Sequence, residues 1–133
     1  DNKPKAKAEA AGALLCLAAG EPTTQKSVAD AGAIRALVAL LNEEDELCLK
    51  KAAGAIAALG KDSVENQDAV EKSKGLGKLV ALLRPTMLDD VSAEACTAIA
   101  VLTKGNQRNQ ERVAAASGIG PLVALLELPG QKA

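Results

Sequence analysis

The chain repeats itself at a spacing of 42 or 43 residues, and this repetition restricts the possible folds more than any other feature. The segment LVALL begins at Leu37, recurs 42 residues later at Leu79, and recurs 43 residues after that at Leu122. Two further blocks keep the same offsets: Ala13-Leu14, Ala55-Ile56 and Ala98-Ile99 form one, and Gln25, Gln67 and Gln110 belong to the other. Three blocks that recur at the same offsets predict a stack of copies of one structural unit.

Each unit is predicted to contain three helices. The first is short, about two turns, as in residues 65–72, and carries one buried Val. The second covers about residues 33–41, and the third about residues 46–59. Apolar residues in the second helix are spaced i, i+3, i+4 and i+7, which places them on one face: Ile34, Leu37, Val38 and Leu41. The third helix has a corresponding apolar stripe: Leu49, Ala52, Ala53, Ile56 and Leu59.

Glycine and proline predict where these helices end. Gly20, Gly60 and Gly105 follow the third helices, where a left-handed cap requires no Cβ atom. Pro85 is predicted to stop a second helix after Arg84, because proline cannot continue it.

One three-helix unit cannot bury its own apolar faces, so the units are expected to stack into a single domain over residues 1–133. Residues 1–22 are predicted to hold a partial repeat with a third helix, 23–62 and 63–105 two full repeats, and 106–133 a first and second helix. This division leaves apolar surfaces uncovered at both ends of the stack, and we expect the chain to be a segment of a longer array.

Composition excludes several classes of function. The chain is 48% hydrophobic, yet it contains no Phe, Tyr, Trp or His. Sixteen basic and 17 acidic residues give a net charge of −1, which predicts no nucleic-acid binding. No apolar run is long enough for a membrane span. Three isolated cysteines, Cys16, Cys48 and Cys96, indicate a reducing, intracellular setting, cytoplasmic or nuclear.

The motifs that could carry chemistry are better explained by structure, so neither catalysis nor a cofactor nor a metal site is expected. The absence of His excludes every His-based dyad and triad. Asp89-Asp90 and the acids at 43–46 stand where helix N-termini favour negative charge. The segment KGLGK at 74–78 lacks the Ser or Thr of a phosphate loop, and is predicted to be a turn into a second helix. The polar stretch 104–112 is predicted to be a solvated loop, with a contact to an acidic partner as the alternative.

The segment QKSVADAGAIRALVALL at 25–41, followed by KAAGAIAAL at 51–59, resembles an armadillo repeat, and the resemblance covers nearly the whole chain. It implies an all-α fold, a right-handed α-solenoid (the armadillo superhelix) of three-helix repeats. HEAT repeats are the nearest alternative, but they have two helices in each unit. The chain resembles the vacuolar and catenin-like repeats more than the importin type.

The resemblance implies that the third helices line a concave groove for partner proteins. In the family, a Trp on the third helix and an Asn one turn later hold the backbone of an extended peptide. The Trp positions here are Gly12, Gly54 and Thr97, and the Asn positions are Cys16, Ala58 and Val101. Charged residues of both signs lie one turn earlier: Glu9, Lys50, Lys51 and Glu94. The groove residues implied by the resemblance are Gly12, Cys16, Lys50, Gly54, Ala58, Glu94, Thr97 and Val101.

These substitutions predict a shallow, largely apolar floor, suited to the apolar face of a helix. The leading prediction is therefore a scaffold that binds protein segments, extended or helical, on its concave face. A self-associating module that stacks through its floor or its ends is an alternative. A nuclear-import-type adaptor for basic peptides is disfavoured, because both the Trp and the Asn ladders are missing.

Overall fold

A computed structural model describes residues 3–87 and 89–129, and these residues form helices joined by short turns, without a strand. The helices, in chain order, are α1 (Pro4–Ala18), α2 (Pro22–Asp30), α3 (Ala33–Leu40), α4 (Glu46–Gly60), α5 (Val64–Lys72), α6 (Gly75–Ala81), α7 (Asp89–Thr103), α8 (Gln107–Ala115) and α9 (Ile119–Leu126). The predicted order of three helices in each unit is confirmed, and in the first complete unit the helices have nine, eight and 15 residues.

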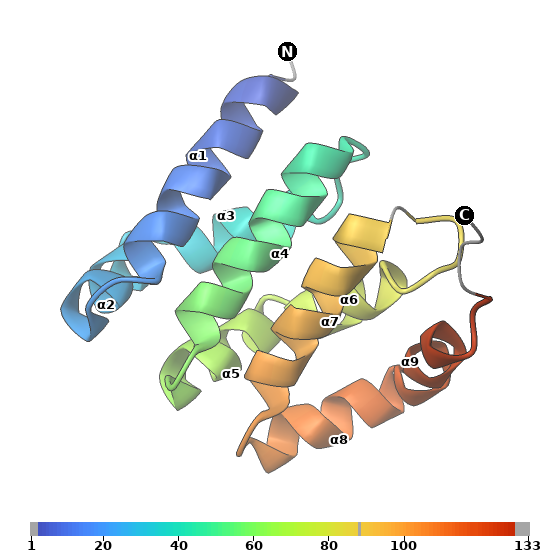
Figure 1. The fold of residues 1–133 in the computed structure, drawn as a ribbon. Helices are drawn as coiled ribbons and strands as arrows, with labels where there is room; N and C mark the ends of the chain where they lie inside the picture. The colour runs from blue at the N-terminus through green and yellow to red at the C-terminus, as the bar shows by residue number, and fades with distance from the viewer. Residues whose placement is uncertain (1–2, 88, 130–133) are drawn as a thin grey trace.

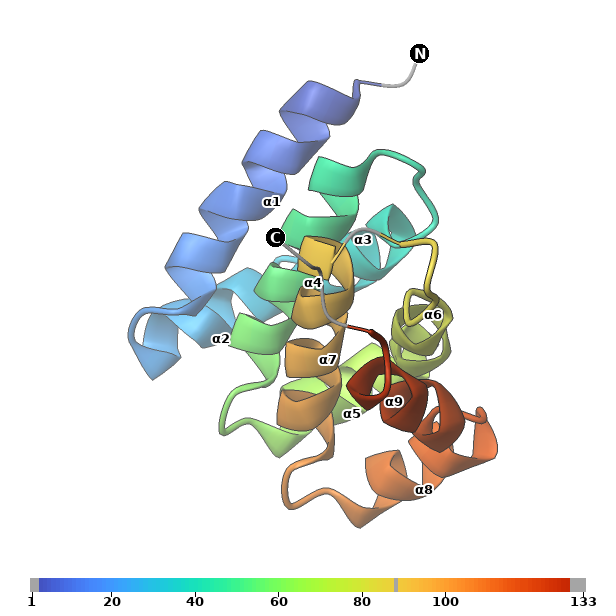
Figure 2. The ribbon, with the colours of Figure 1, turned by 45° about the vertical axis from the view of Figure 1, so that its right-hand side comes forward.

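The helices stack in register, unit upon unit. The third helices α1, α4 and α7 lie side by side as one layer, with α4 between the other two (Figure 1). The second helices α3 and α6 lie behind this layer, and α8 and α9 lie beyond α7 (Figure 1). Turning the molecule shows α1 at one end of the stack and α8 and α9 at the other (Figure 2). The chain is therefore an all-α, right-handed solenoid.

Aliphatic and Ala side chains build the core, as the periodicity predicts. Ile34, Leu37, Val38 and Leu41 are all at most 6% exposed, and the Val of each first helix is buried as well. In α4 the predicted stripe is almost inaccessible, and Ala52, Ala53 and Ala55 have no exposed surface at all. Small residues let neighbouring third helices approach closely, so a core without aromatic rings still packs tightly.

The ends of the helices depart from the prediction at two points. Of Gly20, Gly60 and Gly105, only Gly105 has a positive φ, 66°. Gly60 is the last residue of α4, and Asp62 takes the left-handed conformation after it, with φ 55°. Asp tolerates this region better than most residues with a side chain, because its short polar group can bond locally. Helix α6 ends at Ala81, well before Pro85, so the proline does not end it.

The stretch 104–112 was predicted to be a solvated loop; it is largely exposed, but the prediction of a loop is wrong. Most of it forms α8, which is N-capped by Asn106: its side chain accepts a hydrogen bond from Asn109 N at 3.0 Å. Both Asn106 and Asn109 are buried, at 6% and 0% exposure. The other residues of this stretch are exposed, so its polarity reflects both solvation and the hydrogen bonds of the two buried asparagines. The acidic run 43–46 behaves as predicted, because Asp45 caps α4 by accepting from Cys48 N.

Candidate functional site

The eight residues predicted for the groove lie on the three parallel third helices. We refer to the outward surface of α1, α4 and α7 as the third-helix face (Figure 1). Helix α1 contributes Gly12 and Cys16, α4 contributes Lys50, Gly54 and Ala58, and α7 contributes Glu94, Thr97 and Val101. Because successive third helices repeat the same register, equivalent positions form rows across the face.

At two of the three Trp positions, Gly12 and Gly54, side chains of neighbouring helices lie over the face, whereas Thr97 is exposed. Gly54 is buried, and a Cβ atom there would lie 2.6 Å from Leu15 Cδ1 and 3.5 Å from Glu94 Oε1. At Gly12, a Cβ atom would lie 3.5 Å from Cδ of Lys51. At these two positions, side chains from adjacent units occupy the space that a large ring would fill.

Leu15 belongs to this face, although the sequence does not single it out. A signal was present, because its counterparts in the next two units are the small residues Ala57 and Ala100. Leu15 is the one large side chain at that register position, and it lies over Gly54, whose lack of a side chain makes room for it.

The row at the Asn positions stays more open and has no amide. Cys16 is exposed, and Ala58 and Val101 are half-buried. Val101 leans towards α4, since its Cγ1 atom lies 3.4 Å from where a Cβ atom of Gly60 would be. Beside this row, Thr97 of the Trp positions donates its hydroxyl to the Ala93 carbonyl at 3.1 Å. This row offers apolar surface and no side chain that could hold a peptide backbone by a pair of hydrogen bonds.

Charged side chains of both signs lie beside these rows. Lys50 Nζ lies 3.4 Å from Asp90 Oδ2, joining α4 to α7 across a partly solvated gap. Lys51 stretches over Gly12, and Glu94 approaches Gly54 from α7. The alternation of lysine and glutamate produces no continuous acidic or basic track, so the face does not select strongly for a partner of one charge.

Amide side chains of the first helices bind the C-terminal ends of the third helices. The Gln25 Nε2 atom lies 2.9 to 3.0 Å from the carbonyl oxygens of Ala58, Leu59 and Lys61. In the next two units, Gln67 donates to Gly60 O and Gln110 to Thr103 O, each at 2.9 Å. The last carbonyls of a helix lack intrahelical partners, so these glutamines stabilise the helix ends. Gln25 reaches the third helix that follows it in the chain, whereas Gln67 and Gln110 bind the third helix that precedes them.

Buried asparagines add a second set of bonds that the sequence analysis missed. Asn66 donates to Leu59 O at 2.8 Å, and its counterpart Asn109 donates to Leu102 O at 2.9 Å and to Gln67 O at 3.2 Å. Each precedes its repeated Gln by one residue, so the 43-residue offset between the two asparagines could have revealed them. They link units to one another and fix the register of the third-helix face.

Comparison with known proteins agrees with this architecture. A family model described as Armadillo/beta-catenin-like repeat matches residues 24–59. No curated protein sequence matches the chain. Among solved structures, an engineered protein of the Northeast Structural Genomics Consortium is 30% identical with a TM-score of 0.92, covering 98% of this chain and 53% of that one. The chain has the fold of an armadillo-repeat solenoid.

Two armadillo repeat proteins are also among the similar structures. A designed armadillo repeat protein in complex with the peptide (KR)4 is 29% identical, with a TM-score of 0.88, and the match covers 98% of this chain and 54% of that one. ARO, the armadillo repeats only protein from Plasmodium falciparum, is 25% identical with a TM-score of 0.81, over 93% and 52% of the two chains. The present armadillo chain therefore spans about half the length of these structures.

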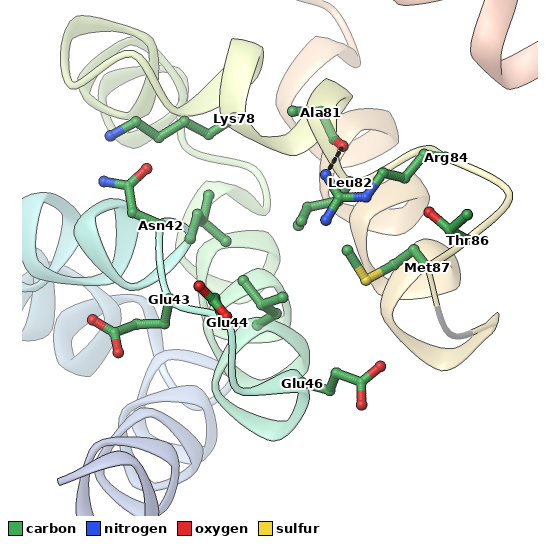
Figure 3. A pocket seen from close by; sticks show the side chains of 12 residues that line it. Asn42, Glu43, Glu44, Glu46, Lys78, Ala81, Leu82, Arg84, Thr86 and Met87 are labelled. Atoms are coloured by element: carbon green, nitrogen blue, oxygen red, sulfur yellow. Dashed lines mark hydrogen bonds between the residues drawn. The ribbon is translucent and has the colours of Figure 1, made fainter. Parts of the chain in front are cut away.

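A pocket of about 570 Å³ opens beside the armadillo stack, between the α3–α4 turn and the segment that joins α6 to α7 (Figure 3). Leu41, Leu49 and Leu82 belong to its lining together with acids of the α3–α4 turn, and Lys78 and Arg84 face it from the second unit. Arg84 Nη1 is directed to the Ala81 carbonyl at 3.4 Å. Nothing in this mixed lining brings a nucleophile and a base together.

The remaining candidate chemistry is also structural. Cys48 is fully buried, and its Sγ atom donates to the Pro4 carbonyl at 3.1 Å. Burial raises the pKa of the Cys48 thiol, with a further contribution from a hydrogen bond with Asp45, and burial also raises the pKa of Cys96. Within residues 3–87 and 89–129, no group of three or more His, Cys, Asp or Glu side chains could hold a metal ion. None of the helices described is both long and apolar enough to cross a membrane.

Proposed function

We propose that this armadillo chain is a scaffold that binds a segment of a partner protein along the third-helix face. The observation that carries the proposal is the apolar row of Cys16, Ala58 and Val101, which crosses three parallel helices in one register. A designed armadillo repeat protein with the same fold is known in complex with a peptide, which supports a binding role for this type of surface. An intracellular location, cytoplasmic or nuclear, belongs to the same proposal, and the free thiol of exposed Cys16 supports it.

The partner segment is proposed to be a helix with one apolar face. An extended peptide leaves its backbone N–H and C=O groups to be satisfied by the scaffold, and the row of Cys16, Ala58 and Val101 contains no amide that could do so. A helix satisfies its own backbone and needs only apolar contact from a groove. The mixed charges of Lys51 and Glu94 also argue against a dedicated site for a basic import signal, which remains the disfavoured alternative.

The test compares binding by the wild-type chain with binding by a double variant, Ala58→Arg/Val101→Arg. Ligands are first selected for the wild-type chain from two displayed libraries, one of amphipathic helices and one of extended peptides that includes basic sequences. Circular dichroism must show that the variant keeps its helix content. We expect helical ligands, and a loss of at least about tenfold in their affinity for the double variant, or about 1.4 kcal/mol.

Ala114→Arg is the matched control, because Ala114 is an exposed apolar residue of α8 that lies outside the third helices. The selected ligands should bind this control variant with the same affinity as they bind the wild type. An unchanged affinity for the double variant would show that the binding site lies on the turns or at the ends of the stack. Selection of basic extended peptides would support the import-type alternative instead.

A further inference from the structure

A groove between the two complete units of the stack carries a local excess of positive charge. It lies between α3 and the turn that joins α5 to α6, on the side of the second helices, and its volume is about 480 Å³ (Figure 1). Among the described residues, its lining contains no acid and four basic side chains: Arg35, Lys72, Lys74 and Lys78. We call it the basic groove. The whole chain has a net charge of −1, so this concentration of charge is a local feature.

No carboxylate neutralises the four cations. Within residues 3–87 and 89–129, none of them forms an ion pair at a nitrogen–oxygen distance of 4.0 Å or less. Glu71, which precedes Lys72 in the chain, is already bound by Arg112 of α8 at 2.7 Å. Lys78 also lines the pocket in Figure 3, where its amine lies apart from the acids of the α3–α4 turn. The repulsion among the cations is therefore unrelieved, and an anionic ligand would relieve it.

The next groove along the stack has no charge at the corresponding positions. The counterparts of the four basic residues, at the 42- or 43-residue offset, are uncharged: Gly77, Ala115, Ser117 and Pro121. The fold of the repeat therefore does not require basic residues here. The dipole of α5 favours a cation in its last turn, which accounts for Lys72 but not for Arg35 on a different helix.

The backbone at Lys74 gives a second indication that the charge is retained for a purpose. Lys74 has a φ of 66°, in the left-handed region, which a residue with a Cβ atom adopts less readily than glycine does. The same conformation is held by Gly32 and Ser117 in the other two units, with φ of 91° and 62°. This turn thus needs no lysine, and strained backbone of this kind is concentrated at functional positions.

We propose that the basic groove binds an acidic segment of a partner protein. Asp and Glu carboxylates of the segment pair with the four cations, and its apolar side chains contact the part of the lining formed by Val38 and Ala39. A small inorganic anion would leave this apolar part uncovered. Single-stranded nucleic acid would need aromatic rings for stacking, and the chain contains none. The basic groove does not include any residue of the third-helix face, so this site is additional to the one proposed above.

The test uses a displayed library of short random peptides, selected on the wild-type chain and counter-selected on the variant Arg35→Gln/Lys74→Gly. Both residues are exposed, and glycine suits the left-handed backbone at position 74, so the fold should be kept. Circular dichroism checks this. We expect the peptides that bind only the wild type to be rich in Asp and Glu. Fluorescence anisotropy should give an affinity for the variant that is at least about tenfold weaker.

Two controls separate a specific groove from general attraction between charges. Lys61→Gln/Lys104→Gln removes the same two charges at exposed positions outside the basic groove, and should bind the selected peptides like the wild type. Replacing Asp and Glu of a selected peptide by Asn and Gln should weaken binding at least about tenfold. Inorganic phosphate should displace the peptide no better than chloride does at equal ionic strength.

Several results would overturn the proposal. They are a selection without any groove-dependent peptide, groove-dependent peptides that are not enriched in Asp and Glu, and equal weakening by the two double variants. Displacement by phosphate beyond that by chloride would assign the groove to a small anion instead. The third-helix face variant Ala58→Arg/Val101→Arg should bind the acidic peptides unchanged, so this proposal and the proposed function can fail separately.

Discussion

Buried amides determine how the units of this chain are joined at the level of single residues. Asn109 has no exposed surface, and its Nδ2 atom donates to carbonyls of both α7 and α5, from Leu102 and Gln67. Its Oδ1 atom has no hydrogen-bond partner within the described residues. The side chain is therefore retained for its donors, which satisfy carbonyls near a helix end that water cannot reach.

Replacing Asn109 with Leu keeps the volume and removes the donors. We expect Asn109→Leu to lower the free energy of unfolding by about 1–3 kcal/mol, because buried carbonyls lose a partner. Loss of the unpaired Oδ1 atom should hold the effect towards the lower end of that range. Urea unfolding followed by circular dichroism measures it. The exposed Gln107→Ala on the same helix should change stability by less than about 0.5 kcal/mol, and equal effects would refute the special role of Asn109.

At the scale of one element, α6 contains two glycines with opposite roles. A Cβ atom on Gly75 would lie 2.5 Å from Val70 Cγ1, 3.0 Å from the Val70 carbonyl oxygen and 3.1 Å from Val38 Cγ2. Gly77, one half-turn further along, has no atom within 4 Å of its Cβ position. The first glycine allows α6 to approach α5 and α3, whereas the second only loosens the helix.

These differences predict opposite effects of the same substitution. Gly77→Ala should stabilise the chain by about 0.5–1 kcal/mol, because Ala loses less backbone entropy in a helix. Gly75→Ala should destabilise it by about 1–3 kcal/mol, since the added methyl group collides with backbone as well as side chains. Thermal unfolding of the two variants beside the wild type gives the sign directly. A stabilising Gly75→Ala would mean that α5 and α6 can separate at little cost.

The helices could be predicted from the sequence because the same spacing of apolar residues recurs three times along the chain, once in each unit. The existence of three helices in each unit and the buried positions of α3 and α4 follow from that spacing. The covering of Gly54 by Leu15 could not be predicted, because it depends on how far one third helix is rotated relative to the next. The same is true of Asp62, since only the exact path of the turn assigns it a positive φ.

At the scale of the whole molecule, burial is concentrated in the middle of the stack. Helix α4 contacts α1 on one side and α7 on the other, and nearly all its residues from Cys48 to Gly60 are buried. Helix α9 has no buried residue, and α1 has an exposed apolar stripe. In a solenoid, each unit is stabilised by its own helices and by its neighbours, so an end unit opens more easily than a central one.

Amide hydrogen exchange of the dilute chain should therefore show a gradient along the stack. We expect the slowest amides in α4 and exchange at least about a hundredfold faster in α9, because opening α9 exposes little additional apolar surface. Mass spectrometry of peptides from each helix measures both. Equal protection of α4 and α9 in dilute solution would show that the ends are covered within a single molecule.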